Sequence, residues 1–264
     1  MQISVSQLAN FIACPRKWWF SHVAKLTPIV EPEALRRGRT VHEYIGAWLS
    51  GKPLPDLGEY GNYGRAFTEN FPLHVDRGEQ ELIETRVEVP TSNGHTLVGV
   101  IDYATYIDEA WHLYDWKTTK PKPFNVGKID LQLLVYDVTL RELRAAKAVH
   151  RSHVFIYPDS GSTQFKRQSY EDSTYDKRKD AWGEIEAGAE MLARLHHGGP
   201  PPMLPGARSP SGGFRPAWPC GWCSYLTLCS HMWQYGQDDG YQAILAEDFI
   251  AEKEETCGEE TEGL

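Results

Sequence analysis

The sequence has no run of apolar residues long enough to cross a bilayer, so it predicts no membrane-spanning helix. Its first residues, MQISVSQLANFIACPRKWW, lack the basic start and apolar core of a secretory signal. Cysteine is also scarce, with five residues among 264. In a chain without an export signal, clustered cysteines hold metal more often than they form disulfides. We therefore expect a cytoplasmic protein in a reducing compartment.

The chain carries little excess charge once its C-terminal tail is set apart. The formal net charge is −9, but residues from Glu247 onward hold eight acidic residues and one lysine. The rest of the chain has 28 acidic and 26 basic residues, a net charge of −2. A nearly neutral body still allows a basic groove, because nucleic-acid binding depends on how charge is distributed. We expect the acidic tail, residues 246–264, to be disordered and solvated.

Four of the cysteines form a pattern that indicates a metal centre. Cys14 stands alone near the start, while Cys220, Cys223 and Cys229 follow a C-x2-C-x5-C spacing. Together they would fasten the two ends of the chain, and their spacing fits either zinc or an iron-sulfur cluster. Cys257, in the acidic tail, is not expected to be a ligand.

Hydrophobic periodicity predicts a single α/β domain over residues 1–245, with a helical N-terminal part (1–80), a core (81–197) and a Cys-rich arm (198–235). Helical spacing of apolar residues predicts helices at 6–14, 16–25, 33–50, 130–144 and 172–197. Alternating or β-branched runs predict strands at 81–89, 96–107, 111–117, 149–157 and 163–170. Segments rich in glycine and proline predict loops at 52–64 and 198–219.

Two aspartates and a lysine lie on consecutive predicted strands, in GVIDYA and LYDWKTTK. If residues 108 and 109 form the turn, Asp102 lies directly opposite Asp115. Two carboxylates in that position destabilise a sheet unless a cation lies between them, and their oxygens favour Mg²⁺ or Mn²⁺. Lys117 shares the face of Asp115 through the two-residue period of a strand. Its ammonium would help to activate a water molecule and stabilise charge developing on a phosphate.

An ordinary surface ion pair between Asp115 and Lys117 is the alternative, because D-x-K alone occurs by chance in many sequences. The G-x-x-D motif on the preceding strand, the two threonines after Lys117 and the helix that follows make the pattern more specific. We therefore favour a cation site. Glu84, on the first predicted strand, would either add a carboxylate to it or remain solvated.

These motifs resemble the PD-(D/E)XK nuclease superfamily, and within it the RecB-like exonuclease branch. In chain order they are RRGRTVHEYI with Gly38 and His42, GVID with Asp102, DWK with Asp115 and Lys117, and QLLVY with Gln132 and Tyr136. The early cysteine and late C-x2-C-x5-C cluster resemble the CRISPR-associated Cas-four nucleases and the iron-sulfur nuclease domain of AddB. The chain departs from the superfamily motif at Asp115, where glutamate is commoner, and at Ile101, where the motif has proline.

The resemblance implies a restriction-endonuclease-like core, with a mixed central sheet flanked by helices and a C-terminal iron-sulfur arm. It implies that His42, Asp102, Asp115 and the carbonyl of Trp116 bind the metal, and that Lys117 is the catalytic lysine. Gln132 and Tyr136 would position the substrate or support the site. The implied cofactor of Cys14, Cys220, Cys223 and Cys229 is a 4Fe–4S cluster.

We therefore expect a Mg²⁺- or Mn²⁺-dependent DNA exonuclease that acts on single-stranded ends, with possible protein partners in CRISPR adaptation or phage recombination. The alternative is a DNA-binding or adaptor module whose catalysis is weak or lost. The intact set of Asp102, Asp115 and Lys117 argues against that alternative, and DNA binding without cleavage in any divalent metal would support it.

Overall fold

The computed structural model places the chain in two compact units. The first contains Met1–Ile12 and Pro32–Leu195, and the second contains Ala13–Glu31 and His196–Leu264. The structure describes residues 1–29, 31–120, 130–159, 161–170, 175–198, 220, 223–229 and 249–251. The loop predicted at 198–219, apart from Gly198, and most of the acidic tail lie outside these ranges.

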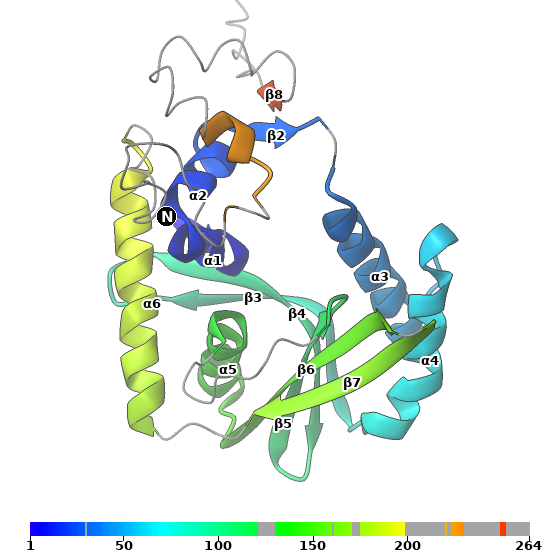
Figure 1. Cartoon of the computed structure of the whole chain (residues 1–264). Helices are drawn as coiled ribbons and strands as arrows, with labels where there is room; N and C mark the ends of the chain where they lie inside the picture. The colour runs from blue at the N-terminus through cyan, green and yellow to red at the C-terminus, as the bar shows by residue number, and fades with distance from the viewer. Residues whose placement is uncertain are drawn as a thin grey trace, which may run out of the picture. The chain divides into compact units, whose positions relative to one another are not determined.

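The first unit is built on a mixed six-stranded sheet (Figure 1). Its strands are β1 (Gln2–Ser4), β3 (Gln80–Pro90), β4 (Thr96–Ile107), β5 (Ala110–Lys117), β6 (Ala148–Asp159) and β7 (Ser162–Tyr170). The order is β1-β4-β5-β6-β7, and β3 pairs with β4 as well. The β1–β4 and β5–β6 pairs are parallel, while β3–β4, β4–β5 and β6–β7 are antiparallel. The predicted mixed α/β architecture is confirmed.

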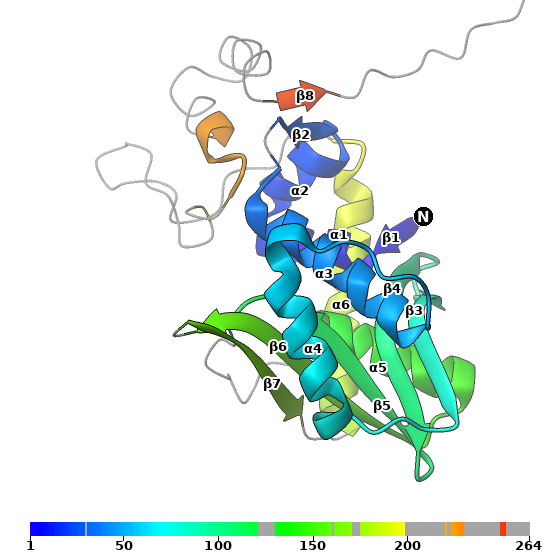
Figure 2. The same ribbon diagram turned by 90° about the vertical axis from the view of Figure 1, so that its right-hand side faces the viewer.

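Helices cover both faces of this sheet (Figures 1 and 2). They are α1 (Val5–Ala13), α3 (Glu33–Leu49), α4 (Gly61–His74), α5 (Leu131–Arg144) and α6 (Tyr175–Leu195), with a short 3₁₀ turn at Gly58–Tyr60. The α3 and α4 helices lie on one face, and α5 lies on the other. None of the described helices is both long enough and apolar enough to cross a membrane.

An aromatic core joins α3 and α4 to the sheet. Phe67 and Phe71 of α4 pack edge-on against Trp116 of β5, with ring centroids 5.3 and 6.2 Å apart. Tyr103 of β4 and Tyr114 of β5 belong to the same buried cluster. Because side chains alternate along a strand, burying Tyr114 and Trp116 on this face turns the residues between and after them toward α5.

Two elements of the first unit differ from the sequence prediction. Helix α4 begins at Gly61, inside the segment predicted as a loop at 52–64. Packing of its buried apolar residues outweighs the low helix propensity of its glycine-containing first turn. Strand β1 was not predicted, since three residues are too few for a periodic pattern. These three residues form a strand because their backbone pairs with the start of β4.

The second unit contains α2 (Pro15–His22), β2 (Leu26–Pro28) and β8 (Phe249–Ala251). Phe20, Leu26, Tyr225 and Leu228 form its buried core. The β2 and β8 strands pair antiparallel. The β8 strand is the part of residues 246–264 that the structure describes, and its pairing with β2 satisfies backbone groups of these three residues.

Candidate active site

The hairpin between β4 and β5 turns at Asp108 and Glu109, as the sequence predicted. Both residues have positive φ, 49° and 62°, which is the backbone form of a type I′ hairpin turn. The predicted register continues along both strands, and its last ladder pair stands one residue before Asp102 and Asp115. The two aspartates therefore lie at the end of the same ladder.

Asp102 lies where β4 parts from β5. The first part of β4 pairs with β1 as far as Val98, and the later part pairs with β5 from Tyr103 onward. At the gap between them, Oδ2 of Asp102 accepts a hydrogen bond from the backbone N–H of Trp116 at 2.9 Å. This bond takes the place of a ladder bond and anchors a carboxylate that is only 6% exposed.

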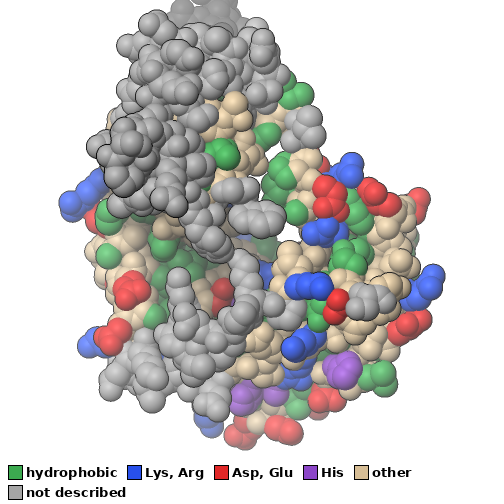
Figure 3. Space-filling model, viewed as in Figure 1, with side chains coloured by type: hydrophobic (Ala, Val, Ile, Leu, Met, Phe, Trp, Pro, Cys, Tyr) green, Lys and Arg blue, Asp and Glu red, His purple; other side chains and the backbone are tan. Residues whose placement is uncertain are grey.

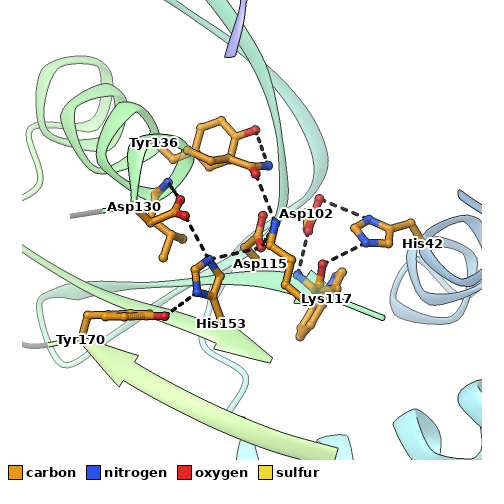
Figure 4. Close-up of polar contacts among 11 residues, drawn as sticks. His42, Asp102, Asp115, Lys117, Asp130, Tyr136, His153 and Tyr170 are labelled. Carbon is orange, nitrogen blue, oxygen red and sulfur yellow. Dashed lines mark hydrogen bonds and ion pairs between the residues drawn. The ribbon is translucent and has the colours of Figure 1, made fainter. Parts of the chain in front are cut away.

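Asp115 and Lys117 lie on the same face of β5, as predicted (Figure 4). Nζ of Lys117 is 2.5 Å from Oδ2 of Asp115 and donates to Oε1 of Gln132 at 3.2 Å. Nε2 of Gln132 donates to the hydroxyl of Tyr136, also at 3.2 Å. The four residues thus form one polar chain between β5 and α5.

His42 approaches the same point from α3. Its Nε2 lies 3.0 Å from the carbonyl oxygen of Trp116, and its Nδ1 lies 3.6 Å from Oδ1 of Asp102. Among the residues that the structure describes, His42, Glu84 and Asp102 each place one donor atom within 4.8 Å of the others. Asp115 is not part of this group of three donors, and it lies instead in the polar chain with Lys117, Gln132 and Tyr136. Glu84, which the sequence left between a ligand and a solvated residue, lies beside His42 and Asp102.

A distortion in β3 and a glycine in α3 admit Glu84 to this group. Glu84 has a positive φ of 44°, and the β3–β4 ladder omits the Glu84–Asp102 pair. A Cβ atom on Gly46 would lie 2.8 Å from Cγ of Glu84, closer than carbon atoms approach in proteins. Glycine at position 46 therefore lets the Glu84 side chain lie across α3.

Burial and neighbouring negative charge both shift the pKa values of this group. Loss of water around the carboxyl and the negative charge of Asp102 raise the pKa of Glu84 to about 7. Burial raises the pKa of Asp115 above its usual range, against the opposing effect of Lys117. Burial favours the neutral ring of His42, but the neighbouring carboxylates outweigh it and raise the pKa. Each carboxylate would ionise more readily beside an added cation.

The donor set fits a hard divalent ion. Carboxylate oxygens and a backbone carbonyl are preferred ligands of Mg²⁺ and Mn²⁺, and a histidine nitrogen is also acceptable to Mn²⁺. Asp115 is 1% exposed, yet Oδ1 has no hydrogen-bond donor among the described residues. A buried carboxylate oxygen without a donor is costly, and coordination would satisfy it.

Sequence reasoning missed three residues at the far side of Asp115 (Figure 4). His153 of β6 lies with Nε2 3.6 Å from Oδ2 of Asp115 and 3.9 Å from Oδ2 of Asp130. The hydroxyl of Tyr170 is 2.5 Å from Nδ1 of His153. Burial lowers the pKa of His153 to about 4. These residues meet through pairing of β5 with β6 and β6 with β7, which no local sequence signal reports.

A groove of about 690 Å³ opens beside the acidic group along α3. His42 and Glu84 form part of its wall, and Arg39 and Lys52 lie along it. On the face of the molecule in Figure 3, the coloured basic and acidic side chains are interspersed, without a broad patch of one sign. The coloured side chains of this face therefore form no broad basic surface.

The four predicted cysteine ligands all belong to the second unit and are free thiols. Sγ of Cys14 caps α2 by accepting a hydrogen bond from the backbone N–H of Lys17 at 3.4 Å. Burial raises the pKa of Cys229 to about 12, and the charges of the other three cysteines add to this rise. The thiols are thus near enough to interact electrostatically.

Comparison with known proteins identifies the family of this site. A model of the PD-(D/E)XK nuclease superfamily matches residues 2–230. No curated protein matches the chain.

One solved structure among the similar ones supports the fold. A candidate exonuclease from Eubacterium rectale is similar with a TM-score of 0.50 and 15% identity, over 75% of this chain and 82% of that chain. An alkaline exonuclease from Laribacter hongkongensis is similar with a TM-score of 0.32 and 14% identity, over 74% of this chain and 91% of that chain. At these identities the likeness concerns the fold alone.

Proposed function

The chain belongs to the PD-(D/E)XK nuclease superfamily, and from this we propose that it is a metal-dependent DNA exonuclease. One observation carries the proposal: Asp102, Asp115 and Lys117 converge from two strands joined by a tight turn, with His42 beside them. Burial of both aspartates, at 6% and 1% exposure, supports a site for a divalent ion, because buried carboxylates need a compensating charge.

The proposed ligands are His42, Asp102, Asp115 and the backbone carbonyl of Trp116, with Glu84 as a further oxygen donor. When bound, Mg²⁺ or Mn²⁺ supplies positive charge that polarises a phosphodiester and lowers the pKa of water. The contribution of the chain is to hold these donors in place. The backbone N–H of Trp116 fixes one oxygen of Asp102 and leaves the other directed toward His42.

Lys117 is proposed to act as a fixed positive charge at the reacting phosphate. Burial opposes its charge, but Asp115 outweighs burial and raises the pKa of Lys117. The ammonium therefore stays protonated at neutral pH and donates hydrogen bonds rather than accepting a proton. Gln132 accepts one of these hydrogen bonds and is itself held by Tyr136, so the two α5 residues orient Lys117.

The substrate is proposed to be a DNA strand with a single-stranded end, as the resemblance to RecB-like exonucleases implies. The groove along α3 leads to His42 and Glu84 and has Arg39 and Lys52 beside it, which supports entry of a phosphate backbone here. We also propose a cytoplasmic setting and protein partners in CRISPR adaptation or recombination.

The four cysteines are proposed to bind a 4Fe–4S cluster that stabilises the second unit. Their place in one unit supports a site of four cysteine ligands. Protein purified without oxygen should be brown and contain about four irons per chain. Zinc without iron in such a preparation would favour the alternative of a tetrahedral zinc site.

Cleavage assays with matched variants test the nuclease proposal. We expect the wild type to release mononucleotides from end-labelled single-stranded DNA in Mn²⁺, and Asp115→Ala or Lys117→Ala to slow this by about 10²–10³-fold or more. Lys120→Ala is a matched control, because Lys120 pairs with Asp159 at 2.9 Å on the surface. Full Mn²⁺-dependent activity in Lys117→Ala would contradict the proposal, and parallel assays on RNA and duplex DNA define the substrate.

A further inference from the structure

His153 is the buried neighbour of the central carboxylate. The parallel register of β5 and β6 pairs Asp115 with His153, and the two residues are 1% and 6% exposed. Nε2 of His153 lies 3.6 Å from Asp115 and 3.9 Å from Asp130, and it has no hydrogen-bond partner among the described residues. Both of the groups that Nε2 faces in these contacts are carboxylates.

Tyr170 fixes the orientation of this ring. Its hydroxyl lies 2.5 Å from Nδ1 of His153, and the two rings are perpendicular, with centroids 5.2 Å apart. If Nδ1 carried the only ring hydrogen, the lone pair of Nε2 would face the carboxylates of Asp115 and Asp130, which is unfavourable. A hydroxyl hydrogen donated by Tyr170 to Nδ1 instead leaves the ring hydrogen on Nε2. In a protonated ring Nε2 carries a hydrogen as well, so it faces Asp115 as a donor in both states.

We propose that His153, oriented by Tyr170, is a positioning residue that holds the carboxylate of Asp115 for the divalent cation. This inference rests on the proposed function. A ligating carboxylate needs its second oxygen fixed by a neighbour, and such neighbours tune metal affinity. The present 3.6 Å separation exceeds hydrogen-bond length by about half an ångström, and bonds of this kind commonly shorten when an active site becomes loaded.

The geometry favours positioning over direct coordination. The described donor group within 4.8 Å contains His42, Glu84 and Asp102, and includes neither Asp115 nor His153. His153 lies on the side of Asp115 that Asp130 and Tyr170 line (Figure 4). Holding Asp115 from this side leaves its other oxygen, which lacks a donor, available to the cation.

Binding of Mn²⁺ to the full chain, measured by titration calorimetry, tests the inference without relying on catalysis. His153→Leu removes the donor and should raise the Kd for Mn²⁺ by about 10–100-fold. His153→Gln keeps an N–H that reaches as far as Nε2 and should recover most of the affinity. Tyr170→Phe removes only the hydroxyl and should give an intermediate Kd. His150→Leu, on the same strand but exposed and next to His112, is the control and should bind as the wild type does.

The possible results separate this inference from the proposed function. If wild-type protein binds Mn²⁺ and Asp115→Ala does not, while His153→Leu binds normally, the inference is overturned and the proposed function stands. Equal losses in His153→Leu and His153→Gln also overturn it, because a donor role requires rescue. If His153→Leu does not fold, Tyr170→Phe decides, and an unchanged Kd overturns the inference. A wild-type chain that binds no Mn²⁺ overturns both.

Discussion

At the scale of single residues, the site depends on places where regular pairing is interrupted. Asp102 makes no ladder pair, because it lies between the part of β4 that pairs with β1 and the part that pairs with β5. Its carboxylate instead accepts a hydrogen bond from the backbone N–H of Trp116. Glu84, the residue of β3 opposite Asp102, also makes no ladder pair and has a positive φ. Interrupted strands that redirect side chains are typical of sites that bind a ligand.

Gly99 shows how one small residue positions the polar chain of the site. A Cβ atom at this position would lie 2.5 Å from Cε1 of Tyr136, whose side chain is 3% exposed and has no room to move away. We expect Gly99→Ala to lower the free energy of unfolding by about 1–3 kcal/mol and to slow cleavage, because Tyr136 orients Gln132. Urea denaturation and the cleavage assay measure both effects.

The control for that change is Gly61→Ala at the start of α4. An added Cβ at Gly61 meets no atom within 4 Å, so alanine should be neutral or stabilise the helix by up to about 1 kcal/mol. Equal unfolding free energies for the two variants would show that the contact between Gly99 and Tyr136 does not constrain the fold.

The raised pKa of Glu84 predicts how stability depends on pH when no divalent metal is present. The folded carboxyl, with a pKa of about 7, binds a proton more tightly than the unfolded one. Its contribution is therefore most favourable below the unfolded pKa and is lost as pH rises toward and through 7. Glu84→Gln removes this loss. Glu84 is partly exposed to solvent, and solvent screening reduces the energy that the pKa shift represents. We therefore expect the free energy of unfolding of Glu84→Gln to exceed that of the wild type by only about 1 kcal/mol at pH 8, with little difference at pH 4.

Urea denaturation of wild type and Glu84→Gln in EDTA at the two pH values measures this difference. Adding Mn²⁺ should reverse the order at pH 8, since the cation stabilises the ionised carboxylate only in the wild type. A wild type that is more stable than the variant at pH 8 in EDTA would contradict the shift.

At the scale of elements, the sequence predicts the register of a strand pair best where a tight turn joins the two strands. The turn at Asp108 and Glu109 fixes the β4–β5 register, so the meeting of Asp102 and Asp115 follows from a local signal. His153 reaches Asp115 only through a parallel pair formed across a helix connection, and nothing near it in sequence sets that register. Helix α4 was missed because its glycine-rich start and internal Pro72 mask apolar residues that are otherwise helically spaced.

The β4–β5 turn carries backbone strain that a single substitution would relieve. Glu109 has a φ of 62°, where a side chain costs about 1–2 kcal/mol relative to glycine. We expect Glu109→Gly to raise the free energy of unfolding by about 1 kcal/mol and to leave cleavage unchanged, because the register is kept. Glu142→Gly, on the exposed side of α5, should instead lower it by about 1 kcal/mol. Thermal or urea unfolding of both variants measures the contrast, and loss of stability in Glu109→Gly would contradict the turn geometry.

At the scale of the whole molecule, the chain divides its tasks between two units with separate cores. The carboxylate–lysine site lies in the unit built on the six-stranded sheet, and the four cysteines lie in the other. The core described for the cysteine unit centres on four residues, with Cys223 and Cys229 packed against it. Small units commonly depend on a metal or cross-links for stability.

Loss of one thiol should therefore unfold the second unit while the first stays folded. We expect Cys229→Ser to lose its bound metal and to be cleaved by protease within residues 13–31 and 196–229 at least about tenfold faster. Amide exchange in β4, β5 and β6 should remain slow, because their pairing and aromatic core belong to the other unit. Cys257→Ser is the matched control and should keep its metal and its protease resistance. If Cys229→Ser retains the wild-type metal content, the four-thiolate centre is wrong; if the sheet loses its amide protection as well, the two units do not unfold independently.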